Sequence, residues 1–282
     1  MHVVTKVTQL RKLLTRARRR GKTIGFVPTM GAFHEGHLSL MRKCKKENDL
    51  TVVSIFVNPA QFAPHEDFKK YPRHKRKNIL LAKSENVDII FYPSVDEMYP
   101  KRYLTYINVE KITATLCGKI RPGHFRGVAT IVGKLLNIIL PNVMYLGQKD
   151  AQQCVVLKHL VRDLDFPVKI KILPTKRENN GLALSSRNEY LSKTQRQEAA
   201  ILYKSLRLAK QKILNGQRHA QQIKNEIRQN ILRNSSGVID YIYCVDAQAL
   251  TPLKNLKGRI LIALAVRFGR TRLIDNILVT AH

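Results

Sequence analysis

Two histidines three positions apart, His34 and His37, mark the stretch of this 282-residue sequence best suited to chemistry. They close residues 28–37, Pro-Thr-Met-Gly-Ala-Phe-His-Glu-Gly-His, which lie between an apolar run and a helix-like run. Glycine lets a backbone approach a ligand closely, and the first N–H groups of a helix attract anions. A strand, a tight loop and a helix start with two imidazoles on one face therefore predict a phosphate-binding corner.

Two other interpretations of this histidine pair remain as alternatives. A zinc helix would use His-Glu-x-x-His, but the spacing here is one residue shorter and the sequence offers no third ligand nearby. The two histidines could also be ordinary surface residues. The strand–loop–helix context favours a nucleotide phosphate site over both.

Polar side chains also follow other predicted strands. Lys149 and Arg187 can neutralise phosphate oxygens, and Ser185 and Ser186 add hydroxyl donors. The amides of Gln61 and Gln153 donate and accept, which suits a small hydroxylated acid. Because ligands bind at the carboxyl ends of parallel strands, we expect these loops to converge. Plain structural roles stay open for several of them: a helix surface for Gln153, a cap for the two serines and a solvated charge for Lys149.

The elements that must position these residues fall into two groups. Apolar runs predict parallel strands at residues 23–27, 50–57, 87–92, 142–146 and 168–173, interleaved with helices at 8–20, 127–140 and 150–164. After residue 175 the pattern predicts helices at 193–215 and 220–233, then antiparallel strands at 238–245, 259–267 and 273–279. We therefore expect an α/β domain over residues 1–175, built on a doubly wound parallel sheet, and a smaller α+β domain over residues 176–282.

Composition narrows the function further. The formal net charge is +30, from 50 Lys and Arg against 20 acids, yet the excess is spread along the chain and tryptophan is absent. This distribution favours a solvated basic surface over a dedicated nucleic-acid site. No apolar run reaches transmembrane length, and four cysteines without a Cys-x-x-Cys pair suggest reduced thiols in a cytoplasmic protein. P-loop, dinucleotide-binding and hydrolase-elbow motifs are all missing from the sequence.

Taken together, these blocks resemble the pantoate–β-alanine ligase family, the pantothenate synthetases, over nearly the whole chain. The resemblance rests on residues 28–37, 54–62 with Tyr-Pro-Arg at 71–73, 121–128, 147–150, 185–188 and Thr-Arg-Leu-Ile-Asp-Asn at 271–276. The His-x-Gly-His pattern alone is shared with cytidylyltransferases and class I aminoacyl-tRNA synthetases, but all the blocks in this order are highly specific. The resemblance implies a Rossmann-like sheet of the HIGH-type nucleotidyltransferase fold.

The resemblance also implies a reaction: ATP and pantoate form pantoyl-adenylate and pyrophosphate, and β-alanine then displaces AMP to give pantothenate. It places Mg²⁺ with the ATP and implies a homodimer. Because residues 74–78 are basic or neutral, we assign no metal ligand to the protein, and the composition leads us to expect no membrane and no specific nucleic-acid partner. His37 is the implied proton donor, with His34 and Lys149 as further catalytic residues. Gln61 and Gln153 are the implied pantoate ligands, and Gln61 also neighbours β-alanine. The implied ATP contacts are Met30, Gly31, Ala32, Phe33, His34, Glu35, Gly36, His37, Gly147, Gln148, Lys149, Asp150, Lys176, Leu184, Ser185, Ser186 and Arg187.

This sequence departs from the family pattern in a few places. Leu184 stands where methionine is common, Lys176 replaces a usual apolar residue, and residues 74–78 are basic or neutral where acids often occur. Two rival functions stay open: another His-x-Gly-His nucleotidyltransferase with a phosphorylated acceptor, and a basic RNA- or DNA-binding protein. Residues 58–62 and Gln153 lack the positive charge that a phosphorylated acceptor needs, and steep salt dependence of binding would identify the second rival. Residues 63–77 and the C-terminal domain are the expected lids over the site.

Overall fold

The computed structural model describes residues 1–64 and 66–282. Its contacts divide the chain into two compact units. The larger unit contains Met1–Glu110, Ile120–Gln148 and Val156–Pro174, and the smaller contains Lys111–Lys119, Lys149–Val155 and Thr175–His282. The predicted domain boundary between residues 175 and 176 stays a prediction, because two earlier segments of the chain also belong to the smaller unit.

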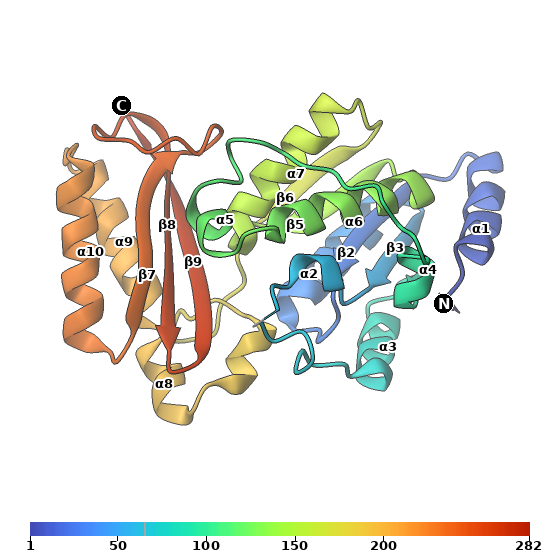
Figure 1. Ribbon diagram of the computed structural model, residues 1–282, viewed down its shortest axis with the longest axis horizontal. Coiled ribbons are helices and arrows are strands. Elements are labelled where there is room, and N and C mark those ends of the chain that lie inside the picture. The colour runs from blue at the N-terminus through green and yellow to red at the C-terminus, as the bar shows by residue number, and fades with distance from the viewer. Residues whose placement is uncertain (65) are drawn as a thin grey trace. The chain divides into compact units, whose positions relative to one another are not determined.

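A six-stranded parallel sheet forms the centre of the larger unit (Figure 1). Its strands, in spatial order, are β1 (His2–Val4), β4 (Ile89–Phe91), β3 (Leu50–Ile55), β2 (Ile24–Thr29), β5 (Val143–Gly147) and β6 (Lys169–Leu173). The predicted α/β class with a parallel sheet is therefore confirmed. The sequence analysis missed β1, whose three residues are too few to show a pattern.

Helices cover both faces of this sheet. Helix α2 (Glu35–Glu47) and α3 (Lys75–Ser84) pack through Met41 and Ala82 against Val53 and neighbouring strand residues in one core. Helix α1 (Val7–Arg19) packs against α6 (His124–Ile139), which is apolar almost all round. Strands buried on two faces read as near-continuous apolar runs, as β3 does.

The strand order reverses at β2, which separates the part of the sheet containing β3 and β4 from the part containing β5 and β6. Strands β2 and β5 are parallel neighbours, so the loops that follow them leave the same edge side by side. In doubly wound sheets this switch point is where ligands bind. The loop after β2 leads to His34 and to His37 on the first turn of α2, and β5 ends at Gly147 and is followed directly by Gln148.

The smaller unit has its own sheet and core. Strands β7 (Val238–Asp246), β8 (Gly258–Phe268) and β9 (Thr271–Ala281) are antiparallel in that order. Helices α9 (Ile201–Leu214) and α10 (Ala220–Asn234) lie along one face of this sheet (Figure 1). Their buried aliphatic side chains and those of the strands form one hydrophobic core. The predicted α+β class with an antiparallel sheet is confirmed for this part of the chain.

The single helix expected at residues 193–215 is wrong. The structure has α8 (Lys193–Glu198), a break at Ala199 and Ala200, and then α9. Both alanines keep helical dihedrals, but the amides of Ala200 and Leu202 bond three residues back, to Gln197 and Ala199. This tighter bonding bends the chain without a glycine or proline, so no residue type in the sequence marks the break.

The remaining helices are α4 (Val95–Met98), α5 (Leu116–Ile120) and α7 (Ala151–Asp163). The described residues also form the 3-10 turns η1 (Pro59–Gln61), η2 (Gln148–Asp150) and η3 (Ser186–Tyr190). All four cysteines are buried and free. Among the described residues, no helix combines the length and apolar character needed to cross a membrane.

Candidate active site

The start of α2 is organised by its two histidines. His34 is the N-cap, and its Nδ1 accepts a hydrogen bond from the Gly36 N–H at 3.1 Å. The Nδ1 of His37 accepts from the His34 N–H at 3.4 Å, which completes a reciprocal capping box. The two imidazole rings lie 4.2 Å apart between centroids.

These contacts determine which ring nitrogens can face a ligand. A nitrogen that accepts a hydrogen bond carries no proton, so the cap assigns the Nε2–H tautomer to neutral His34 and His37. In that tautomer each imidazole carries its proton on Nε2. The sequence analysis expected the N–H groups of the helix start to attract the anion, but the Gly36 N–H is already used by His34.

The loop before α2 needs its glycine. Gly31 has φ +88°, and a Cβ there would lie 2.9 Å from the Asn78 side-chain nitrogen. Buried Asn78 accepts a hydrogen bond from the Phe33 N–H at 3.1 Å and so fixes the turn that carries Met30 and Gly31. The sequence analysis did not single out Asn78, because its role depends on a contact between distant parts of the chain.

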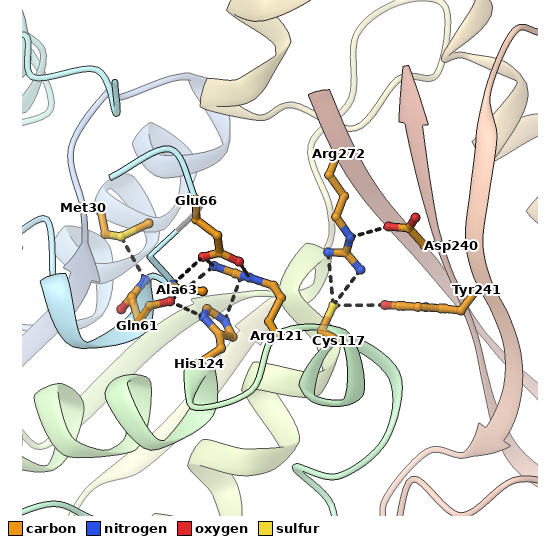
Figure 2. A network of polar contacts seen from close by, with 10 residues as sticks. All are labelled: Met30, Gln61, Ala63, Glu66, Cys117, Arg121, His124, Asp240, Tyr241 and Arg272. Carbon is orange, nitrogen blue, oxygen red and sulfur yellow. Dashed lines mark hydrogen bonds and ion pairs between the residues drawn. The ribbon is translucent and has the colours of Figure 1, made fainter. Parts of the chain in front are cut away.

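Gln61, the predicted pantoate ligand in the larger unit, is held by several contacts (Figure 2). Its Nε2 lies 3.0 Å from the Met30 sulfur, and its Oε1 accepts from Asn58 at 3.1 Å. Its backbone carbonyl lies 2.9 Å from Nδ1 of His124. The start of α6 packs against the backbone next to Gln61 so closely that a Cβ on Gly127 would lie 2.2 Å from the Ala60 carbonyl oxygen.

An ion pair supports the same turn. Arg121 contacts both carboxylate oxygens of Glu66, at 2.5 and 2.6 Å, and also the Gln61 carbonyl (Figure 2). Burial favours the neutral acid, but the Arg121 hydrogen bonds and charge outweigh it and lower the pKa of Glu66. Glu66 therefore stays ionised at neutral pH and keeps its ion pair with Arg121, which in turn contacts the Gln61 carbonyl.

In the smaller unit, Lys149 follows β5 closely, within η2. Its ammonium lies 3.7 Å from the Asp150 carboxylate, with the lysine side chain 21% exposed. Gln153 lies further along, on the first turn of α7, and is partly exposed. Its neighbour Gln152 is buried and binds backbone groups of residues 112, 115 and 117.

Five further predicted ATP ligands lie on one hairpin and the turn after it. Leu184 donates its N–H to the Lys176 carbonyl at 2.9 Å, and Arg177 bridges to Ala183. Ser185 caps η3 by accepting from the Arg187 N–H at 3.2 Å. The structure thus brings Lys176 beside Leu184, the first of four consecutive predicted ligands, Leu184, Ser185, Ser186 and Arg187.

The predicted site residues divide between the units. The larger unit holds Met30, Gly31, Ala32, Phe33, His34, Glu35, Gly36, His37, Gln61, Gly147 and Gln148, and the smaller holds Lys149, Asp150, Gln153, Lys176, Leu184, Ser185, Ser186 and Arg187. Within the larger unit, Met30 and Gln61 touch. Sequence reasoning quoted the segments containing Asn58, Arg121, His124 and Asn276 but assigned these residues no role.

Fold and site together define an α/β protein of the HIGH-type nucleotidyltransferase class, with a His-x-Gly-His helix start at the switch point of its sheet. A family model described as pantoate-beta-alanine ligase matches residues 2–278. The chain belongs to this family.

Similar proteins agree along the full length. A pantothenate synthetase of Caldicellulosiruptor saccharolyticus is 51% identical over 279 residues, 99% of each chain. The crystal structure of pantothenate synthetase from Thermus thermophilus superposes with a TM-score of 0.93 at 40% identity, covering 98% of this chain and 99% of that one. A pantoate-beta-alanine ligase from Francisella tularensis, complexed with beta-gamma ATP and beta-alanine, has a TM-score of 0.80 at 38% identity, covering 99% and 97%.

Proposed function

We propose that this chain condenses pantoate with β-alanine at the expense of ATP, through a pantoyl-adenylate. The observation that carries the proposal is the capped pair His34 and His37 at the start of α2, the helix that follows the strand at which the sheet order reverses. Full-length identity to pantothenate synthetases supports it. The same family membership argues against the rival interpretations, a different nucleotidyltransferase or a nucleic-acid binder.

The first step forms a bond between a pantoate carboxylate oxygen and the α-phosphorus and releases pyrophosphate. The carboxylate is ionised at neutral pH and needs no general base. What the step needs is alignment and stabilisation of the charge that grows on the phosphate oxygens. We assign that stabilisation to the Nε2–H groups of His34 and His37 and to the Lys149 ammonium, with His37 as proton donor.

The second step forms the amide bond between the β-alanine nitrogen and the pantoyl carbonyl carbon, and AMP leaves with the bridging oxygen. The β-alanine ammonium must lose a proton before it attacks. We assign Gln61, whose amide is fixed beside Met30, to pantoate and to the neighbourhood of β-alanine, and Gln153 to pantoate. Neutral amides suit a hydroxy acid because they donate and accept without adding charge.

ATP enters as its Mg²⁺ complex, in which the ion neutralises phosphate charge. Mg²⁺ usually keeps substrate phosphates and waters as ligands. Among the described residues, no three His, Cys, Asp or Glu side chains cluster as a metal cage. The remaining assigned ATP contacts are Met30, Gly31, Ala32, Phe33, Glu35, Gly36, Gly147, Gln148, Asp150, Lys176, Leu184, Ser185, Ser186 and Arg187.

Three further properties complete the proposal. Residues 176–282 act as a lid domain, together with the segment 63–77, of which residue 65 lies outside the described residues. Closure would protect the mixed anhydride from water. The four buried, free cysteines suit the reducing cytoplasm. The family resemblance supports a homodimer, which light scattering during size-exclusion chromatography would test.

The function is tested by measuring pyrophosphate and AMP release while each of ATP, pantoate and β-alanine is omitted in turn. We expect pyrophosphate from a single turnover with ATP and pantoate alone, and multiple turnovers with AMP release only when β-alanine is added. AMP release that ignores β-alanine, or turnover that requires a phosphorylated acceptor, would refute the proposal.

A further inference from the structure

We propose that the consecutive residues Asp275 and Asn276 on β9 are positioning residues for adenylate formation. Together they hold the 3-10 turn η2, which contains Lys149 and is called the Lys149 turn below, and the 176–187 hairpin, which carries Ser185 and Ser186. This inference rests on the proposed function, because it acts through Lys149 and the 176–187 hairpin. It assigns a role to the Thr-Arg-Leu-Ile-Asp-Asn block at 271–276, which the reaction itself leaves unexplained.

Asn276 fixes the Lys149 turn directly. Its Nδ2 donates to the Lys149 carbonyl at 2.9 Å, and Asn276 itself is only 5% exposed. The Lys149 ammonium sits at the end of a flexible stem, so its location depends on where its backbone is held. The buried Asn276 amide holds that carbonyl in place, and so it fixes the backbone from which the Lys149 side chain extends toward the phosphate.

Asp275 fixes the hairpin. Its two carboxylate oxygens accept from Arg177 at 2.7 and 2.9 Å, and Asp275 is 3% exposed. The same guanidinium donates to the Gly181 carbonyl at 3.0 Å and lies 3.5 Å from the Tyr203 ring centroid. Arg177 is next to Lys176 and bridges to Ala183, so the ion pair anchors both strands of the hairpin. A two-pronged buried pair fixes orientation as well as distance.

The geometry of a strand explains why neighbouring residues serve two loops. Side chains alternate between the faces of a sheet, so Asp275 and Asn276 point to opposite sides of β9. Asp275 shares its face with Leu273 and Val279, which belong to the core under the helices. Asn276 shares its face with Arg272, whose guanidinium nitrogens lie 3.7 Å from the Cys117 sulfur and whose Nε donates to Asp240 at 2.8 Å (Figure 2).

Arg272 and Asn276 therefore hold the two segments that join the smaller unit from earlier in the chain, 111–119 and 149–155. Gln152 links those two segments to each other, since its amide accepts from the Cys117 N–H and donates to the carbonyls of Ile112 and Thr115. Strand β9 therefore holds segment 149–155, which carries Lys149 and Gln153, and segment 111–119, which is bonded to it.

The test is a double-mutant cycle on the rate of adenylate formation, measured as pyrophosphate release in a single turnover. Asn276→Ala removes the donor to the Lys149 carbonyl, and we expect a roughly tenfold to hundredfold loss of rate, the scale of small misplacements in active sites. Lys149→Ala should lose at least as much. The double variant should be no slower than Lys149→Ala alone, because Asn276 acts through Lys149.

The matched control is Asn230→Ala in the same unit, which removes a 2.8 Å bond to Ser205 and should leave the rate unchanged. Asn276→Asp provides a second variant if the alanine variant does not fold, since a carboxylate cannot donate to the carbonyl. Losses that add in the double variant, or a normal rate in the Asn276 variants while Lys149→Ala is slow, would overturn the inference. A normal rate in Lys149→Ala would instead refute the assignment of Lys149 in the proposed function and remove the inference with it.

Discussion

The two sets of phosphate-binding candidates are held in different ways. At the start of α2, His34 and His37 cap each other within four consecutive residues, so local sequence alone defines their geometry. Lys149 and the 176–187 hairpin depend on Asn276 and Asp275, which lie about a hundred residues further along the chain. The geometry of the histidine pair therefore forms locally, whereas the Lys149 turn and the hairpin are held only once the tertiary fold is complete.

This difference leads to separate expectations for the two regions. A substitution in the local cap should change chemistry with little effect on the rest of the fold. A substitution near the long-range contacts should alter stability and substrate binding together. Variants of His37, Gly127, Gln153 and Glu66 probe the contrast, in descending order of expected effect.

His37→Gln separates capping from chemistry. Glutamine at this helix position can still accept from the N-cap backbone, as in an ordinary capping box, but it lacks the imidazole. We expect adenylate formation to fall by roughly a hundredfold or more, as for other lost charge-stabilising donors, while thermal stability stays near that of the parent. His37→Ala should lose the same activity and also some stability. The control is His159→Gln on α7, and parent-like turnover of His37→Gln would remove His37 from the mechanism.

Gly127→Ala tests the close packing under Gln61. The new Cβ would meet the Ala60 backbone at 2.2 Å, and a backbone atom cannot swing aside. We expect a loss of about 1–3 kcal/mol in unfolding free energy, as for overpacked sites, and a raised KM for pantoate. Gly133→Ala is the matched control on the same helix, because its Cβ would meet side chains alone, the end of Ile107 at 2.6 Å and the ring of Phe166 at 3.9 Å. Equal urea-unfolding curves for the two variants would contradict the assigned role of this contact.

Gln153→Ala tests the contribution of the smaller unit to pantoate binding. Loss of one amide contact is worth about 1–1.5 kcal/mol, so the KM for pantoate should rise roughly tenfold. ATP binding should stay as in the parent, and the exposed Gln221→Ala should change neither value. Steady-state kinetics with each substrate varied will show this, and an equal loss for ATP and pantoate would contradict the assignment.

Glu66→Gln is expected to have the smallest effect, and its size depends on pH. The pKa of Glu66 is lowered in the folded protein, so its pair with Arg121 adds stability above the ordinary value of 4.5 and loses it as pH falls through the folded value. At pH 7 the variant should be less stable by about 1 kcal/mol. That difference should shrink in urea unfolding as the pH falls below 4.5, and a difference independent of pH would show that the charge is not its source.

The same contrast explains what the sequence could predict. The parallel sheet, the antiparallel C-terminal sheet and the histidine corner depend on local apolar runs and adjacent residues, and they were readable. The break between α8 and α9 was not, since it arises from bonding at Ala199 and Ala200 without glycine or proline. Asn78, Asp275 and Asn276 were equally hidden as supports, because each acts on residues 45 or more positions away.

The capping of α2 was only half visible. The sequence placed both imidazoles at the helix start, but it did not show that His34 uses the Gly36 N–H. Capping residues are usually read as serine, threonine, aspartate or asparagine, and histidine in this role gives no standard signal. The cap also determines the tautomer, since the proton of each neutral ring then lies on the nitrogen opposite the cap.

The adenylate is the central claim, and the fate of one oxygen atom tests it most directly. Pantoate labelled with oxygen-18 in its carboxylate should be converted with ATP and β-alanine, and the nucleotide product analysed by mass spectrometry. If pantoate attacks the α-phosphorus, each AMP formed carries one labelled oxygen and the pyrophosphate carries none. Label in inorganic phosphate or pyrophosphate, or unlabelled AMP from fully labelled pantoate, would contradict the account.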